Sequence, residues 1–95
     1  MVIAVLELKL AVRQARSLKE KRQVINSLKD RLRNRYNVSI AEVDSHDLHQ
    51  IADIGVVQVA SDARYARGSL DSIVDAVRRF RGAQLTDYSV EIFHQ

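Results

Sequence analysis

The residues best suited to chemistry are five polar side chains spaced three or four positions apart along one segment. They are Lys19, Arg22, Asn26, Lys29 and Arg33. In a helix, at about 100° per residue, these spacings place them in one stripe away from the apolar positions. At about 1.5 Å of rise per residue the stripe is about 21 Å long. Cations arranged over that length can contact several successive phosphates of a nucleic acid.

Two further arginines, Arg13 and Arg16, precede this stripe, close to where the helix should begin. An anion at that point would also meet unpaired backbone N–H groups and the positive end of the helix dipole. We therefore predict one RNA- or anion-binding surface, formed by Arg13, Arg16, Lys19, Arg22, Lys29 and Arg33. The alternative is an ordinary solvated helix face, whose charge Asp30 dilutes.

The distribution of charge along the chain favours the binding interpretation. The formal net charge is +3, but residues 1–40 contain ten Lys and Arg against three Asp and Glu. Residues 41–95 contain five basic and nine acidic residues. Such asymmetry is typical of a protein that presents one face to an anionic partner.

Support for metal binding is weak. Asp44, His46, Asp47 and His49 carry side chains that can ligate metals, but they occupy a polar stretch that reads as a loop. Two histidines three positions apart suit a helix better than an extended loop, and the chain has no cysteine to supply a thiolate. We predict no tightly bound zinc and no cofactor.

Support for catalysis is also weak, because no phosphate-binding glycine loop or nucleophile elbow is present. An acylphosphatase-like enzyme is the alternative. Those enzymes share the element order expected below and bind phosphate where the first strand meets the first helix, near Arg13, Arg16 and Ser17 here. However, they cradle the phosphate in a glycine-containing loop, and residues 12–17 include no glycine. We predict a protein without a catalytic site.

Hydrophobic periodicity predicts the elements that position these residues. Apolar residues alternate over residues 2–12, as in a half-buried strand. Ser17 and Glu20 form a capping box that starts a helix ending near Tyr36, with Asn37 as a left-handed residue closing it. Strands follow at 38–43 and 51–60, where Gly55 marks a bulge or a close contact.

A second helix should begin after Ser61 or Asp62, or only at Ser69 because Gly68 lies inside it, and should end near Arg81. Gly82 is then placed as its C-cap. Alternation around Tyr88, Val90 and Ile92 predicts a last strand.

The order β-α-β-β-α-β predicts one α+β domain of the ferredoxin-like kind over residues 1–95. It should consist of a four-stranded antiparallel sheet with two helices on one face. The two strands expected at its centre contain no aromatic residue, so bases cannot stack there as they do on an RNA recognition motif. The apolar run at the start is interrupted by Glu7 and Lys9 and is too short to span a bilayer. We expect a soluble, cytoplasmic protein.

Three apolar side chains should lie on the sheet face that the helices leave open. Ile3 and Val5 are out of phase with the alternating core residues of their strand, and Phe93 is out of phase with Tyr88, Val90 and Ile92. This placement predicts a homodimer that buries Ile3, Val5 and Phe93. The alternative is that Ile3 and Phe93, which are close to the termini, fold back over their own sheet edge.

The chain resembles the YlxP-like family of small bacterial proteins, a domain of unknown function. Residues 15–22, 28–35, 37–44 and 61–64 carry the resemblance, and the Ser-Leu-Lys-Glu-Lys-Arg block at 17–22 is its most specific part. His49 stands where similar proteins often have tryptophan. The resemblance implies a ferredoxin-like fold and no established catalytic residues.

Genes of this family often lie beside those of initiation factor two and ribosome-binding factor A, which implies a role near translation or ribosome assembly. Our leading hypothesis is a non-catalytic module that docks its basic helix on ribosomal RNA, a ribosomal subunit or a ribosome-assembly or translation complex. The alternative is a protein-interaction module that uses an acidic partner or self-association.

Overall fold

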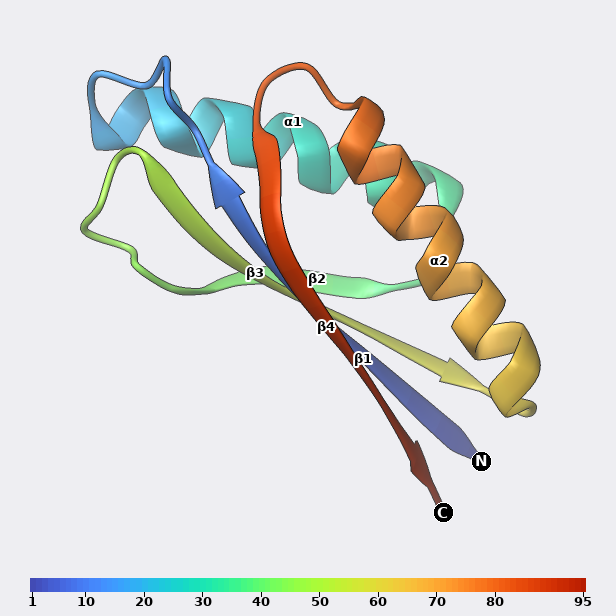
Figure 1. Cartoon of the computed structure of the whole chain (residues 1–95). Coiled ribbons are helices and arrows are strands. Elements are labelled where there is room, and N and C mark those ends of the chain that lie inside the picture. The colour runs from blue at the N-terminus through green and yellow to red at the C-terminus, as the bar shows by residue number, and fades with distance from the viewer.

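Six regular elements follow one another in the predicted order in the computed structural model, which describes residues 1–95 (Figure 1). They are β1 (Val2–Ala11), α1 (Leu18–Arg35), β2 (Ser39–Asp44), β3 (Ile51–Ala60), α2 (Ala63–Arg79) and β4 (Gln84–His94).

The four strands form one antiparallel sheet in the order β2-β3-β1-β4. This is the ferredoxin-like arrangement that the element order predicted. Strands β1 and β3 pair along their full length, so the two strands without aromatic residues do occupy the centre of the sheet. Both helices cover the same face, and the opposite face is left open (Figure 1).

The core lies between that covered face and the two helices. Alternate residues of β1, among them Leu6 and Leu8, point into it and are buried, as the period of two predicted. Helix α1 contributes a buried stripe that includes Leu28 and Leu32, and α2 contributes one that includes Ile73. Neither α1 nor α2 has the combined length and apolar character needed to cross a membrane.

The start of α1 confirms the predicted cap, with one difference in detail. The Ser17 hydroxyl accepts a hydrogen bond from the Glu20 backbone N–H at 3.1 Å. The Glu20 carboxylate reaches back to the N–H of Arg16 at 3.0 Å, rather than to that of Ser17. At the other end, the prediction of a left-handed Asn37 is wrong. Tyr36 leaves the helix in an extended conformation, and the only non-glycine residue with a positive φ is Ser45.

Helix α2 begins after its N-cap Asp62 and runs through Gly68, so a start at Ser69 is wrong. Gly82 is not a left-handed C-cap either, because no glycine has a positive φ. A Cβ at Gly82 would instead lie 2.9 Å from the Phe80 ring, so close packing requires the glycine. Gly55 likewise marks a close contact, since its Cβ would lie 3.0 Å from Val43, and the bulge falls on β2.

Candidate anion-binding surface

The predicted stripe lies on the flank of α1 that faces β2. Lys19, Arg22 and Asn26 are exposed, but Lys29 is half-buried. The Arg33 guanidinium donates a hydrogen bond to the Ile40 carbonyl of β2 at 3.0 Å. Lys29 and Arg33 are thus partly engaged with the protein, although Arg33 remains exposed. Lys19 and Arg22 are exposed and form no ion pair.

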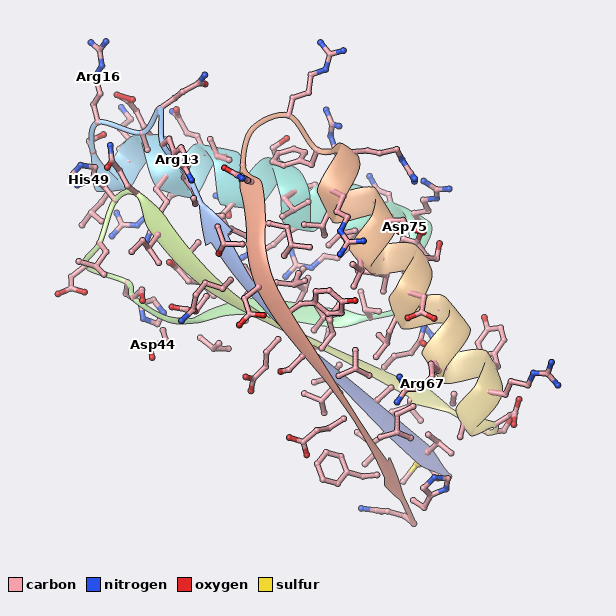
Figure 2. The ribbon with its side chains drawn as sticks, in the orientation of Figure 1. Arg13, Arg16, Asp44, His49, Arg67 and Asp75 are labelled. Carbon is pink, nitrogen blue, oxygen red and sulfur yellow. The ribbon has the colours of Figure 1, made fainter.

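The loop between β1 and α1 exposes both of its arginines, and Arg16 projects outward from it (Figure 2). Two of its amide groups have internal partners. The Arg16 N–H donates to the Glu20 carboxylate at 3.0 Å, and the Ala15 N–H donates to the Val12 carbonyl at 3.1 Å. The N–H groups of Arg13 and Gln14 make no hydrogen bond within the protein. An anion at this loop could therefore meet arginine side chains and backbone donors together.

Lys21 has a structural role that reasoning from the sequence did not find. It is fully buried, and its ammonium lies 2.7 Å from the Glu42 carboxylate. It also donates hydrogen bonds to the carbonyls of Ser45 at 2.9 Å and Ile51 at 3.2 Å. One ion pair and two hydrogen bonds therefore engage its ammonium inside the protein, so Lys21 takes no part in binding. Its position was the signal, because it stands four residues before Ile25 on the apolar stripe of the helix.

A second basic group lies on the other side of α1 and joins parts of the chain that are far apart in sequence. Arg31 of α1, Arg79 at the end of α2 and Arg81 in the following turn line one cavity of about 590 Å³. We call this group the arginine hollow. Reasoning along α1 alone could not find it, because only the tertiary fold brings the end of α2 beside α1.

The two layers of the molecule carry opposite charge. The helices hold eleven Lys and Arg against four Asp and Glu, whereas the strands hold one Lys against six acidic residues. Only two ion pairs form, Lys9–Asp53 at 3.8 Å and Lys21–Glu42. The exposed cations of the helix layer therefore have no carboxylate partners.

The open face of the sheet carries acidic and apolar groups instead. A cavity of about 400 Å³ on the sheet is lined by Glu7, Asp44, Asp53 and Asp87, with Lys9 among them. An anionic ligand is repelled from this side of the molecule. Charge alone thus distinguishes the helix layer as the side that an anion approaches.

The other end of the open face is apolar. Ile3 pairs with Val59 on β3 and with Phe93 on β4, and Val5 pairs with Val57. We call these five residues the apolar patch. Val59 is 61% exposed and Phe93 is 47% exposed. The predicted placement of Ile3, Val5 and Phe93 on one face is correct, and Val57 and Val59 extend it.

The loop between β2 and β3 brings no metal-binding group together. Asp44 and His49 lie well apart (Figure 2), and His46 has a ring nitrogen 3.2 Å from the Glu42 carbonyl. No three His, Asp or Glu side chains gather around a common point anywhere in the structure. The absence of tightly bound zinc stays a prediction.

Comparisons with known proteins add the following. A family model described as "Protein of unknown function (DUF503)" matches residues 3–90. The "Uncharacterized protein YlxP" of Bacillus subtilis (strain 168) is 29% identical over 92 residues, which cover 97% of this chain and 100% of that protein.

Two solved structures are similar in fold. The de novo designed protein Foldit4 has a TM-score of 0.55 at 9% identity, over 100% of this chain and 99% of the other. A crystal structure of a putative antibiotic biosynthesis monooxygenase from Deinococcus radiodurans has a TM-score of 0.50 at 16% identity, over 100% and 92%. At these identities the similarity concerns the fold alone.

Proposed function

The chain belongs to the YlxP-like family described as protein of unknown function DUF503, and on that premise we propose that it is a non-catalytic RNA-binding module. The helix layer binds the phosphate backbone of ribosomal RNA, in a ribosomal subunit or in a complex of ribosome assembly or translation. The contacts come from the side chains of Lys19 and Arg22, with Lys29 and Arg33 beside them and Arg13 and Arg16 at the helix start.

The observation that carries this proposal is the separation of charge between the two layers. Eleven basic residues belong to the helices, and none of the exposed ones is neutralised by a carboxylate. A protein gains little stability from unpaired like charges on one side, but a polyanion that meets them releases counterions. RNA, whose phosphates follow one another along its backbone, is a polyanion that can meet such a row of cations.

Binding should depend on backbone more than on base sequence. The central strands offer no aromatic side chain on which bases could stack. Modest sequence preference and steep salt dependence are therefore expected.

The test is a salt titration of binding to a structured ribosomal RNA fragment. The double variant Lys19→Gln/Arg22→Gln removes two exposed cations that form no ion pair, and it preserves good helix formers. We expect the slope of log K against log salt to fall by about 1 to 2, because each phosphate that is no longer neutralised lowers it by roughly one unit. The variant Arg64→Gln/Arg67→Gln loses the same charge from exposed positions at the start of α2 and is the control.

Equal slopes in the two variants would reject the stripe as the RNA-binding surface. Co-sedimentation of the tagged protein with ribosomal subunits from its own cells would then test the ribosomal partner separately. A protein that stays in the supernatant at low salt contradicts that part of the proposal.

The apolar patch favours a second function, self-association. Its five side chains lie on paired strands and form one continuous surface, which scattered exposure of single residues does not produce. A second copy of the chain, bringing the same patch, would cover it. This surface lies on the face away from the helices, so a dimer would leave the helix layer open for RNA.

A further inference from the structure

The arginine hollow gathers three arginines and has no acidic residue in its lining. Its walls are completed by Gln23, Val24, Ser27, Phe80 and Gly82, and none of these residues is acidic. An adjoining cavity of about 160 Å³ shares Arg31, Arg79 and Phe80 and adds Arg35, again without a carboxylate. Four arginines therefore line these two cavities, which share Arg31, Arg79 and Phe80.

The hollow is held in shape by packing and not by ion pairs. The Arg31 guanidinium lies 5.2 Å from the centroid of the Phe80 ring, in a cation–π contact. Phe80 is itself buried, and Gly82 leaves its ring the space that a side chain would fill. Arg31 is thus oriented by an aromatic ring, which leaves its N–H groups available to a ligand.

Arg79 has a carboxylate within reach along its own helix but does not use it. Asp75 stands one turn earlier, at the spacing that allows a helical ion pair, yet no such pair forms. Both Arg79 and Arg81 are exposed. Arginines that line one cavity without a carboxylate favour the binding of an anion there.

We propose that the arginine hollow binds a phosphate group. The planar guanidinium presents two parallel N–H donors that match two phosphate oxygens, and Arg31, Arg79 and Arg81 offer three such groups. Gln23 and Ser27 add neutral donors on the α1 side. The volume of about 590 Å³ lies in the range of small-molecule sites and accommodates more than one phosphate.

The hollow is separate from the stripe. Arg31 follows Arg22 by nine positions, which at about 100° per residue places it about 180° around α1. A phosphate can therefore bind in the hollow whether or not RNA binds the stripe. The phosphate has two possible sources, the backbone of an RNA and a small phosphorylated molecule such as a nucleotide.

Isothermal titration calorimetry of the full chain tests the site with two probes. Inorganic pyrophosphate represents a small phosphorylated ligand, and a short RNA with a 5′-hydroxyl represents the backbone. The variant Arg79→Gln/Arg81→Gln removes two exposed guanidinium groups and leaves the Arg31–Phe80 contact in place. We expect the affinity for at least one probe to fall about tenfold or more, since removing a bidentate guanidinium–phosphate interaction is worth about that factor.

Two further variants separate a built site from general charge. Arg64→Gln/Arg67→Gln removes equal charge elsewhere on α2 and should change affinity less than about threefold. Ser27→Leu narrows the hollow without changing charge, at an exposed helix position where leucine is well tolerated, and should also weaken binding.

The outcomes decide both the site and the source of the phosphate. Weakened pyrophosphate binding supports the hollow as a site for small phosphorylated molecules, and weakened RNA binding alone supports it as a site for backbone phosphate. If Arg79→Gln/Arg81→Gln and the control Arg64→Gln/Arg67→Gln bind both probes with equal affinity, the proposal of a phosphate site in the hollow is overturned. Lys19→Gln/Arg22→Gln should leave pyrophosphate binding unchanged, so failure of the stripe and failure of the hollow give different results.

Discussion

Lys21 shows how one side chain can be basic and still belong to the core. Its ammonium meets one carboxylate and two carbonyls, all supplied by β2, β3 and the loop between them. The Glu42 oxygen that it contacts is buried and has no other polar partner. Burying a charge is tolerated only when it is paired in this way, so Lys21 and Glu42 depend on each other. The first turns of α1 are thereby attached to β2, β3 and the loop between them.

Replacing Lys21 by alanine should destabilise the fold severely. The substitution leaves the Glu42 carboxylate buried without its partner, and removing one member of a buried pair costs about 3–5 kcal/mol of unfolding free energy. Urea denaturation measures the loss. The matched control is Lys19→Ala, two positions earlier and exposed, which should change stability by less than about 0.5 kcal/mol.

A small effect of Lys21→Ala would mean that water replaces the ammonium and that the pair is not tightly buried. The double variant Lys21→Met/Glu42→Leu adds a second test. It removes both charges and should recover part of the loss, but the Ser45 and Ile51 carbonyls remain without a donor.

At the scale of the elements, the sequence predicted correctly those features of a helix or strand that depend only on residues nearby in the chain. The Ser17 cap, the alternation in β1 and the strand at 51–60 depend on neighbours in sequence, and each was predicted correctly. Gly82 was misread because its role depends on a residue from another element. A Cβ at Gly82 would meet the Phe80 ring and also Val24 of α1, which no local pattern reveals.

The candidate site divides in the same way. Spacing along α1 was enough to find the stripe, since its members share one helix. The partial engagement of Lys29 and Arg33 depends on where β2 packs, and the arginine hollow depends on where α2 ends. Those features follow from tertiary packing and could not be derived from the period of a single helix.

The two glycines near α2 should respond oppositely to alanine. Gly68 lies inside the helix, and a Cβ there would meet nothing within 4 Å, so Gly68→Ala should stabilise the protein by about 0.5–1 kcal/mol. Gly82→Ala would press a methyl group against the Phe80 ring and Val24 and should destabilise it by about 1–3 kcal/mol.

Thermal unfolding of both variants beside the wild type tests in one experiment whether Gly68→Ala raises the stability and Gly82→Ala lowers it. The pair is informative because the substitution is the same at each position. Stabilisation by Gly82→Ala would show that the ring of Phe80 moves freely aside. Arg31 would then lack the fixed support that we ascribe to it.

For the whole molecule, the open face of the sheet is the largest surface that the helices do not cover. One end of it is the apolar patch and the other is acidic. Exposure of apolar side chains on adjoining strands has a free-energy cost that burial against a second copy would remove. The acidic end limits which proteins can approach, and the apolar end is where contact is favourable.

We therefore predict that the wild-type protein dimerises and that Val59→Lys/Phe93→Ser makes it monomeric. Both residues are exposed on the patch, so polar replacements should disturb contact between copies more than folding. Sedimentation equilibrium at micromolar concentrations measures the association. Tyr65→Ser is the control, because Tyr65 is an exposed aromatic residue on α2, away from the patch. A wild-type protein that sediments as a monomer at high micromolar concentration rules out the dimer.

The opposite charges of the two layers make the molecule a permanent electric dipole. A net charge of only +3 understates the field near its surface, since the helix side is far more positive and the sheet side is negative. In the field of a large polyanion the protein experiences a torque and turns its helices forward before any contact is made. Encounters with the RNA that we propose as partner should thus become productive more often than random orientation would allow. On a chromatography column, the same dipole should let one protein adhere to both cation and anion exchangers at low salt, by opposite sides.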